Sequence, residues 1–469
     1  MGGMFGVVSE NCAKTLFYGT DYHSHLGTES AGLAVWGPSG FQNTIHSISQ
    51  AQFKSRFVED YKEMQGAMGI GAIDNESPQP LIIRSKFGTY ALAATGLITN
   101  KDDLSRGLLR DGASFSEMAG GGVNSVELVA KLINRGDDIV DGIVRMQEAI
   151  EGSICLLLMA AEGIYAARDR YGRFPLVVAK EIRTDGGPHG VAAATEASSF
   201  PNLGYEPVRF LGPGEIVRLD RTGIHDERAA GDERHVCAFL WIYTGDPASI
   251  YEGISVENAR ERCGQAMARN DDVDADFVTG VPDSGVGHAI GYAMESGLPF
   301  RRPLVKYTPG YGRSYTPPSQ DIRDIVATMK LSAVRDVIRD SRMVLCDDSL
   351  VRGTQLKNFT IRKLWDNGAK EIHVRPACPP LMFPCRYASS TRTASELATH
   401  RAICALEGDA GAHHLEEYLD HRSERYRRMV EWIRSYINVT SLKYPPIEDM
   451  IEAIGLPGEK LCLYCWRGR

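Results

Sequence analysis

Residues 344–354 read Val-Leu-Cys-Asp-Asp-Ser-Leu-Val-Arg-Gly-Thr, and this stretch decides the fold of the C-terminal half. An apolar run ends in two carboxylates, and a loop of small and hydroxylated residues follows. From Gln355 to Asn367 apolar residues recur at roughly helical spacing, and Gly368 is a typical helix stop. Residues 371–375 predict the next strand. The sequence therefore predicts a strand–loop–helix–strand unit.

The loop of this unit has the properties of an anion site. Backbone N–H groups at a helix N-terminus and the helix dipole favour a phosphate. Asp347 and Asp348 stand at the carboxyl end of the strand, where open parallel sheets bind their ligands. Two acidic residues alone could simply cap a helix. The whole string is more specific: it resembles the fingerprint of type I phosphoribosyltransferases, and in particular the loop of the glutamine phosphoribosyl pyrophosphate amidotransferases (amidophosphoribosyltransferases).

Length and composition place the chain among globular proteins. Its 469 residues, 43% hydrophobic and 24% charged, predict two or three domains with ample core. The net charge of -8 gives no general attraction to nucleic acid or anionic membranes. No apolar run reaches the roughly 18 residues of a membrane span, and the N-terminus lacks the pattern of a secretory signal. We therefore expect a cytoplasmic protein with no nucleic-acid or membrane partner.

Residues 1–232 predict layered sheets with helices outside, because short apolar runs alternate with glycine and polar clusters. Three ordered segments resemble the glutaminase domain of the same family: His25–Leu33, Arg168–Leu176 and Phe210–Ile216. The resemblance implies an Ntn-hydrolase-like αββα domain of the class 2 glutamine amidotransferase type.

The catalytic positions of that domain do not match the family. The family opens its first strand with a processed cysteine, whose thiolate attacks glutamine and whose α-amine is the base. Here the corresponding segment begins at Phe5, and a phenyl ring is no nucleophile. Asp74 aligns with the arginine that binds the glutamine carboxylate, Thr95 with the oxyanion-hole asparagine, and Ser125 lies near the aligned position of an aspartate. Cys12 is an alternative nucleophile after propeptide removal, and an ordinary cysteine is its other reading. We expect a glutaminase fold without glutaminase chemistry.

Residues 233–469 alternate between helices and strands, which predicts a parallel sheet. The resemblance implies a type I phosphoribosyltransferase domain with a C-terminal helical extension, whose helical segment covers residues 413–436. A second glycine-containing loop follows the strand predicted at 276–280, and its Val-Pro-Asp-Ser resembles the family's pyrophosphate loop. In that loop Asp283, Ser284 and Gly285 are the expected substrate-binding residues.

The substrate implied by the resemblance is phosphoribosyl pyrophosphate, which carries its own leaving group. Displacement of this leaving group needs Mg²⁺ on the pyrophosphate and carboxylates at the ribose. By resemblance, Asp347 and Asp348 contact the ribose diol or Mg²⁺, and Ser284 is a further Mg²⁺ ligand. By resemblance, Arg313 would belong to the loop that closes over the substrate and Lys330 to a segment that follows it, although the family's Asn-Arg-Tyr before Arg313 is replaced. A solvated basic loop is the alternative for both residues. The expected 5′-phosphate ligands are Ser349, Arg352, Gly353 and Thr354.

Cys462 and Cys465 form a two-residue-spaced pair that alone would suit a redox site, zinc or no function. The contexts of Cys237 and Cys385 resemble those of the other two cluster ligands in iron–sulfur-type amidotransferases. The resemblance thus implies a [4Fe-4S] cluster on these four thiolates, with a four-cysteine zinc site as the alternative.

The resemblance, together with the altered glutaminase positions, implies transfer of phosphoribosyl to ammonia or another small amine, with release of pyrophosphate, in purine nucleotide biosynthesis. The expected assembly is a homo-oligomer, a dimer or tetramer, and an active homologue or another ammonia donor is a candidate partner. The alternative is a non-catalytic paralogue that binds phosphoribosyl pyrophosphate or a nucleotide for regulation.

Overall fold

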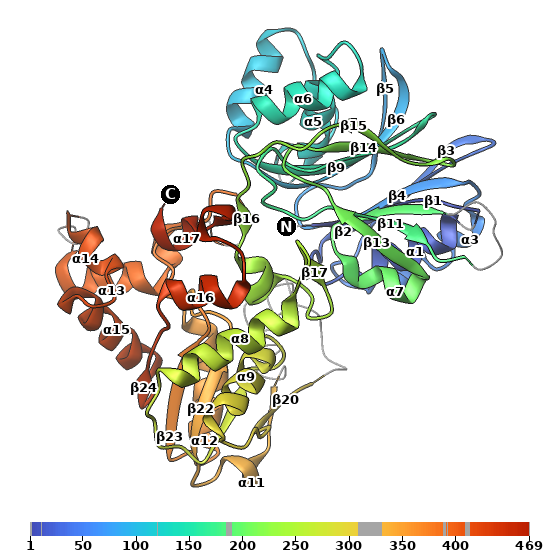
Figure 1. Cartoon of the computed structure of the whole chain (residues 1–469). Helices are drawn as coiled ribbons and strands as arrows, with labels where there is room; N and C mark the ends of the chain where they lie inside the picture. Colours follow the sequence, from blue (N-terminus) through green and yellow to red (C-terminus); the bar gives the residue numbers. More distant parts are fainter. Residues whose placement is uncertain are drawn as a thin grey trace. The chain divides into compact units, whose positions relative to one another are not determined.

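A computed structural model describes residues 2–10, 12–119, 121–183, 190–307, 331–387, 391, 393–408 and 413–468. The chain forms two compact units. The N-terminal unit comprises Met1–Cys237, Ile250–Glu252 and Arg386–Ser390; the C-terminal unit comprises Ala238–Ser249, Gly253–Cys385 and Thr391–Arg469. Figure 1 shows both units.

Two antiparallel sheets form the centre of the N-terminal unit. The seven-stranded sheet has the order β13-β11-β12-β1-β4-β2-β3, and the six-stranded sheet has the order β15-β14-β10-β9-β6-β5. The strands of the first are β13 (Tyr205–Phe210), β11 (Val177–Glu181), β12 (Val191–Ala194), β1 (Gly3–Val8), β4 (Met68–Asp74), β2 (Ser30–Gly37) and β3 (Gly40–Ser47). Those of the second are β15 (Gly223–Arg228), β14 (Ile216–Asp220), β10 (Gly163–Ala167), β9 (Gly152–Ala160), β6 (Gly88–Ile98) and β5 (Leu81–Ser85).

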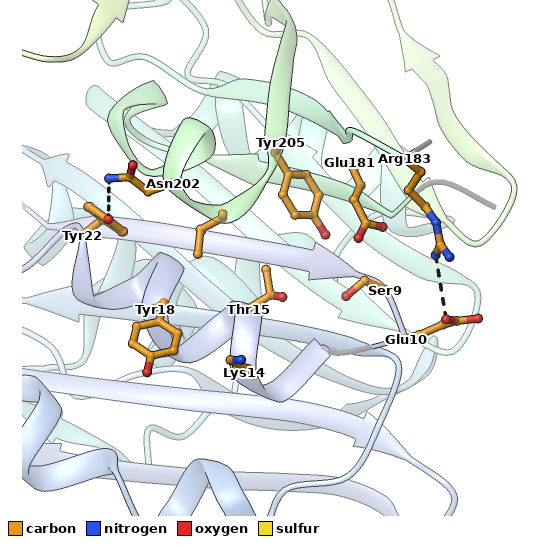
Figure 2. A pocket seen from close by; sticks show the side chains of 11 residues that line it. Ser9, Glu10, Lys14, Thr15, Tyr18, Tyr22, Glu181, Arg183, Asn202 and Tyr205 are labelled. Atoms are coloured by element: carbon orange, nitrogen blue, oxygen red, sulfur yellow. Dashed lines mark hydrogen bonds and ion pairs between the residues drawn. The ribbon is translucent and has the colours of Figure 1, made fainter. Parts of the chain in front are cut away.

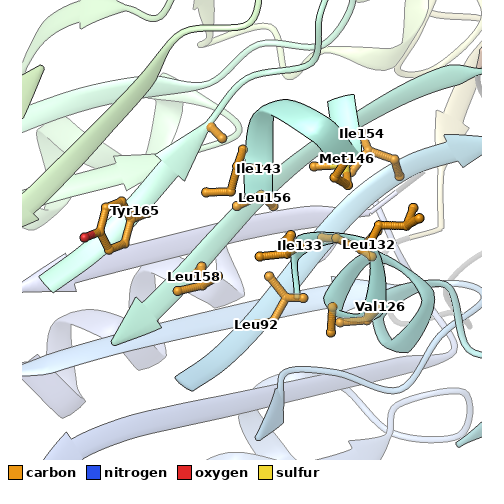
Figure 3. Close-up of a cluster of buried hydrophobic side chains, with 14 of the residues drawn as sticks. Leu92, Val126, Leu132, Ile133, Ile143, Met146, Ile154, Leu156, Leu158 and Tyr165 are labelled. Atoms are coloured by element: carbon orange, nitrogen blue, oxygen red, sulfur yellow. The ribbon is translucent and has the colours of Figure 1, made fainter. Parts of the chain in front are cut away.

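Helices cover the outer faces of the two sheets. The six-stranded sheet packs on α4 (Lys101–Arg110), α5 (Ser125–Ile133) and α6 (Ile139–Ala149) through a cluster that includes Leu92, Leu156 and Ile143 (Figure 3). On the seven-stranded sheet, α1 (Cys12–Asp21) and α7 (Phe200–Leu203) pack with Leu16 and Phe200. A third cluster joins the inner faces of both sheets. The unit is therefore the predicted αββα sandwich.

A four-stranded parallel sheet organises the C-terminal unit. Its order is β19 (Phe277–Gly280), β22 (Arg342–Asp347), β23 (Glu371–Pro376) and β24 (Ser441–Leu442). All three strand pairs are parallel, with Gly280 opposite Cys346 and Asp347 opposite Pro376. This register brings the carboxyl ends of β19 and β22 to one edge of the sheet, as the strand–loop–helix interpretation predicts.

Helices of this unit pack on one another and on the sheet, and two of them form where the sequence predicts helix. The helix α8 (Val256–Arg269) begins at Ser255, whose hydroxyl caps the amide of Asn258 at 3.3 Å. The helix predicted from 355 to 367 begins as a π-helix at Leu356–Ile361 and continues as α12 (Arg362–Asp366). The segment predicted helical at 413–436 contains two helices, α14 (Leu415–Leu419) and α15 (Glu424–Ile437).

The fold-class prediction is confirmed: an Ntn-type sandwich precedes a phosphoribosyltransferase-type domain with a parallel sheet. Over the described parts of the chain, no helix has the length and hydropathy needed to cross a bilayer.

Candidate active site

Two loops meet at the carboxyl edge of the parallel sheet. The first, residues 281–285, follows β19 and leads into α9 (Val286–Ser296); the second, residues 348–354, follows β22. The first loop lies against the end of β22, from which the second loop starts, because the Val281 amide donates to the Cys346 carbonyl at 2.9 Å. A Cβ on Gly285 would lie 2.3 Å from that same carbonyl oxygen. Only glycine fits there, so Gly285 allows the first loop to approach the end of β22 this closely.

The acidic pair faces the first loop. The Ser284 hydroxyl donates to Oδ1 of Asp347 at 3.3 Å, and the Asp348 amide donates to the same oxygen at 3.0 Å. The Ser349 hydroxyl donates to Asp348 Oδ1. The predicted ligands from both loops are thus brought together around two adjacent carboxylates.

Both carboxylates are more than nine-tenths buried, which changes their acidity. Burial, together with the neighbouring Asp348 charge, raises the pKa of Asp347 well above its usual value. Burial likewise raises the pKa of Asp348. A divalent cation beside them would restore the charged forms, so this oxygen set fits Mg²⁺.

The other predicted substrate-binding residues belong to the same two loops. Asp283 forms an ion pair with Lys306 at 2.8 Å, and Lys306 begins the segment that the sequence interprets as the closing loop. Arg352 is exposed and pairs with Glu396 at 3.0 Å. Gly353 has φ +70°, a conformation that favours glycine. The predicted lid residues Arg313 and Lys330 lie outside the described residues.

Sequence reasoning missed two residues behind the phosphate loop. Tyr436 on α15 hydrogen-bonds with Thr354, and Arg401 on α13 (Ala398–Glu407) donates to the Arg352 carbonyl. Both are distant in sequence from the loop, and neither belongs to a local motif.

The N-terminal unit corrects the prediction that Phe5 replaces the nucleophilic cysteine. The residue beside the other altered catalytic positions is Gly2: its amide donates to Thr95 Oγ1 at 2.9 Å, and a Cβ there would lie 2.8 Å from Asp74 Oδ1. Phe5 lies within β1, is fully buried and packs against Phe200. The misassignment is a register error of three residues.

The correction leaves the site without a side-chain nucleophile. Gly2 has no functional group, and a Cβ would also lie 2.5 Å from the Ile73 carbonyl oxygen. Burial raises the pKa of Asp74, which receives the Ser77 amide at 3.0 Å. The alternative candidate Cys12 is buried in the α1 core, and burial raises the pKa of its thiol.

A separate cavity of about 560 Å³ opens in the same unit, near α1 and α7 (Figure 2). Tyr18, Tyr22 and Tyr205 contribute to its wall together with Lys14. Its lining contains neither Gly2 nor Asp74, so it is not the remnant of the glutaminase site.

Three of the four predicted cluster cysteines lie in the C-terminal unit. The Met382 and Phe383 amides both donate to the Cys465 carbonyl, at 2.9 and 3.0 Å, and Cys385 follows two residues later. Cys237 is the last residue of the first segment of the N-terminal unit. No group of three or more His, Cys, Asp or Glu side chains stands in a metal-binding arrangement among the residues that the structure describes. The cluster therefore stays a prediction.

Known proteins resemble this chain in both its N-terminal and its C-terminal half. Residues 68–200 match a family model described as a glutamine amidotransferase domain. The chain is 31% identical over 474 residues to an amidophosphoribosyltransferase of Archaeoglobus fulgidus, covering 99% of this chain and 95% of the relative. The relative from Methanocaldococcus jannaschii is 30% identical, covering 100% of this chain and 97% of the relative.

Two solved structures extend the likeness to the fold. Glutamine phosphoribosylpyrophosphate amidotransferase from B. subtilis, complexed with ADP and GMP, superposes with a TM-score of 0.83 at 29% identity, covering 100% of this chain and 96% of that chain. A structure of an allosteric regulatory enzyme of purine biosynthesis gives a TM-score of 0.84 at 29% identity, covering 100% and 95%. The chain belongs to the amidophosphoribosyltransferase family.

Proposed function

We propose that this protein transfers phosphoribosyl from phosphoribosyl pyrophosphate to ammonia or another small amine, releases pyrophosphate, and serves purine nucleotide biosynthesis. The observation that carries the proposal is the Ser284–Asp347 contact, which joins a pyrophosphate-type loop to an acidic pair. A chain that had lost phosphoribosyl chemistry would have no need to keep two buried carboxylates with raised pKa values beside that loop.

The substrate would lie across the two loops. Residues 281–285 would hold the pyrophosphate at the N-terminus of α9, and Ser349–Thr354 would hold the 5′-phosphate. Asp347 and Asp348 would face the ribose, and with Ser284 they would hold Mg²⁺. When bound, Mg²⁺ neutralises charge on the departing pyrophosphate.

The reaction is a displacement at the anomeric carbon. The C1–O bond to pyrophosphate breaks, the oxygen keeps the electron pair, and the amine lone pair forms the C1–N bond. The added nitrogen then loses one proton to solvent. The ionised carboxylates favour the positive charge that develops on the ring, so no covalent protein nucleophile is required.

The nitrogen would come from free ammonia or a small amine. Glutamine hydrolysis needs a nucleophile and a cation for the substrate carboxylate, whereas this unit has Gly2 and the carboxylate Asp74 at those positions. The negative charge of an ionised Asp74 would repel the glutamine carboxylate. Retention of the fold supports a structural role for the N-terminal unit.

The cysteines complete the proposal. Cys237, Cys385, Cys462 and Cys465 would hold a [4Fe-4S] cluster, for which four thiolates are the required donor set. The cluster would brace the C-terminal segment and supplies no step of the transfer.

The test supplies the protein with phosphoribosyl pyrophosphate, Mg²⁺ and either ammonium or glutamine as the nitrogen source, and measures the pyrophosphate that is released. We expect release with ammonium alone, and none from Asp347→Asn. Release that is driven equally by glutamine would contradict the loss of glutaminase activity. Tight substrate binding with no release for any amine would instead support the regulatory paralogue. Light scattering of the same sample tests the predicted dimer or tetramer.

A further inference from the structure

The 5′-phosphate loop is held from behind by two helices. The Ala398 amide at the start of α13 donates to the Val351 carbonyl at 2.8 Å. One turn later, the Arg401 guanidinium donates through Nη2 to the Arg352 carbonyl. The carbonyls of Val351 and Arg352 therefore both point toward α13. This orientation favours a loop whose backbone amides point away from α13, and a phosphate would bind on that side.

The same guanidinium reaches the second helix. Nη1 of Arg401 donates to the Tyr436 hydroxyl at 3.2 Å. Tyr436 is fixed from several sides: its ring stacks on Trp432 at 5.3 Å and 5°, and Lys357 Nζ lies 4.2 Å from its centroid. A single arginine therefore joins the loop backbone to a ring that has little freedom to move.

The Tyr436 hydroxyl also hydrogen-bonds with Thr354, a predicted phosphate ligand. Arginine only donates, so the phenol oxygen accepts from Arg401. The Thr354 hydrogen bond lowers the pKa of Tyr436, as do Arg401 and Lys357, so Thr354 also donates to the phenol oxygen. The loop and α13 therefore each donate to the same oxygen of α15, which anchors the end of the loop.

We propose that Arg401 and Tyr436 are positioning residues for the 5′-phosphate. They hold the loop Ser349–Thr354 in its binding conformation before the substrate arrives, Arg401 through the Arg352 carbonyl and Tyr436 through the Thr354 hydroxyl. Preorganisation of this kind lowers the entropic cost of binding. This inference rests on the proposed function only for the identity of the anion.

Geometry separates this role from a general effect on folding. The contacts of Arg401 and Tyr436 involve residues 352 and 354 of the phosphate loop, whereas pyrophosphate would bind at residues 281–285. Loss of the support should therefore weaken ligands that carry a 5′-phosphate and spare pyrophosphate.

The experiment titrates the full-length protein and Mg²⁺ with ribose 5-phosphate and, separately, with inorganic pyrophosphate by calorimetry. Tyr436→Phe removes one oxygen and keeps the ring, and Arg401→Gln removes both hydrogen bonds. We expect each to weaken ribose 5-phosphate about tenfold and to leave pyrophosphate within about twofold, as loss of one charge-assisted hydrogen bond implies. Arg401→Lys should recover part of the loss, and the double variant should lose little beyond Arg401→Gln.

The matched control is Arg427→Gln, at an exposed arginine near the start of α15, whereas Tyr436 lies near its end. It should bind both ligands like the wild type. Unchanged ribose 5-phosphate affinity in Tyr436→Phe, or an equal loss for both ligands, would overturn the inference. If the wild type bound ribose 5-phosphate but released no pyrophosphate from phosphoribosyl pyrophosphate, the proposed function would fail while the binding comparison remained decisive.

Discussion

The hydroxyl oxygen of Ser284 lies 3.3 Å from Oδ1 of Asp347, although the two residues are 63 positions apart in the sequence. The contact exists because β19 and β22 are parallel neighbours whose carboxyl ends coincide. Burial raises the pKa of Asp347, and the hydrogen bond from Ser284 partly offsets this effect because it stabilises the ionised carboxylate. The two loops of the candidate site are therefore coupled before any ligand binds.

Asp347→Asn should abolish pyrophosphate release and stabilise the metal-free protein. The folded state keeps a proton on Asp347 at pH values where the unfolded chain has lost it, so stability falls as pH rises from about 4 through the raised pKa. Asparagine does not titrate, so the variant should exceed the wild type in unfolding free energy by an amount that grows with pH. The difference should reach roughly 1 kcal/mol or more at pH 8. Urea denaturation with a chelator at pH 4 and pH 8 measures it. An advantage that is larger at pH 4 would contradict this sign.

Ser284→Ala should raise the Mg²⁺ concentration needed for half-maximal pyrophosphate release about tenfold, because one oxygen ligand and one hydrogen bond are lost. Ser296→Ala is the control, since its hydroxyl donates to the Tyr292 carbonyl at the far end of α9. Titration of both variants with Mg²⁺ at fixed substrate makes the comparison. Equal Mg²⁺ requirements in the two variants would remove Ser284 from the metal site.

Gly285→Ala should separate the two loops. The added methyl group would lie 2.3 Å from the Cys346 carbonyl oxygen and 2.7 Å from the Val281 nitrogen, both backbone atoms. We expect a loss of roughly 1–3 kcal/mol of unfolding free energy and at least a tenfold loss of activity. Gly107→Ala, in α4 with open space around it, should keep activity and gain up to about 1 kcal/mol. Calorimetry and pyrophosphate release distinguish the pair.

Local pattern was sufficient for much of the C-terminal unit. The apolar run before Asp347 predicts β22, and the apolar spacing after Gln355 predicts the helical segment found at Leu356–Asp366. Local pattern failed at Phe5, because a short apolar strand with glycines looks alike in several registers. Only its pairing with β4, Gly3 opposite Ile73, and the Gly2–Thr95 bond show which residue meets the altered site.

The support behind the phosphate loop had no sequence signal for a physical reason. Arg401 and Tyr436 contact the loop across 49 and 82 positions of the chain, through side chains on different helices. A helical pattern predicts which face of α15 is buried, since Ile433 and Ile437 are apolar. It does not predict which polar residue on that helix meets a loop from another part of the fold.

The cysteine prediction concerns metal content. Protein purified without oxygen should contain about four iron and four sulfide per chain and absorb broadly near 400 nm, as a [4Fe-4S] cluster on four thiolates requires. Cys462→Ser should remove the cluster, whereas Cys404→Ser, at an exposed cysteine outside the predicted set, should retain it. Because Cys465 accepts the Met382 and Phe383 amides, cluster loss should also loosen the 379–385 segment, seen as faster hydrogen exchange there. One zinc and no iron would select the four-cysteine zinc site instead, and neither metal would contradict both assignments.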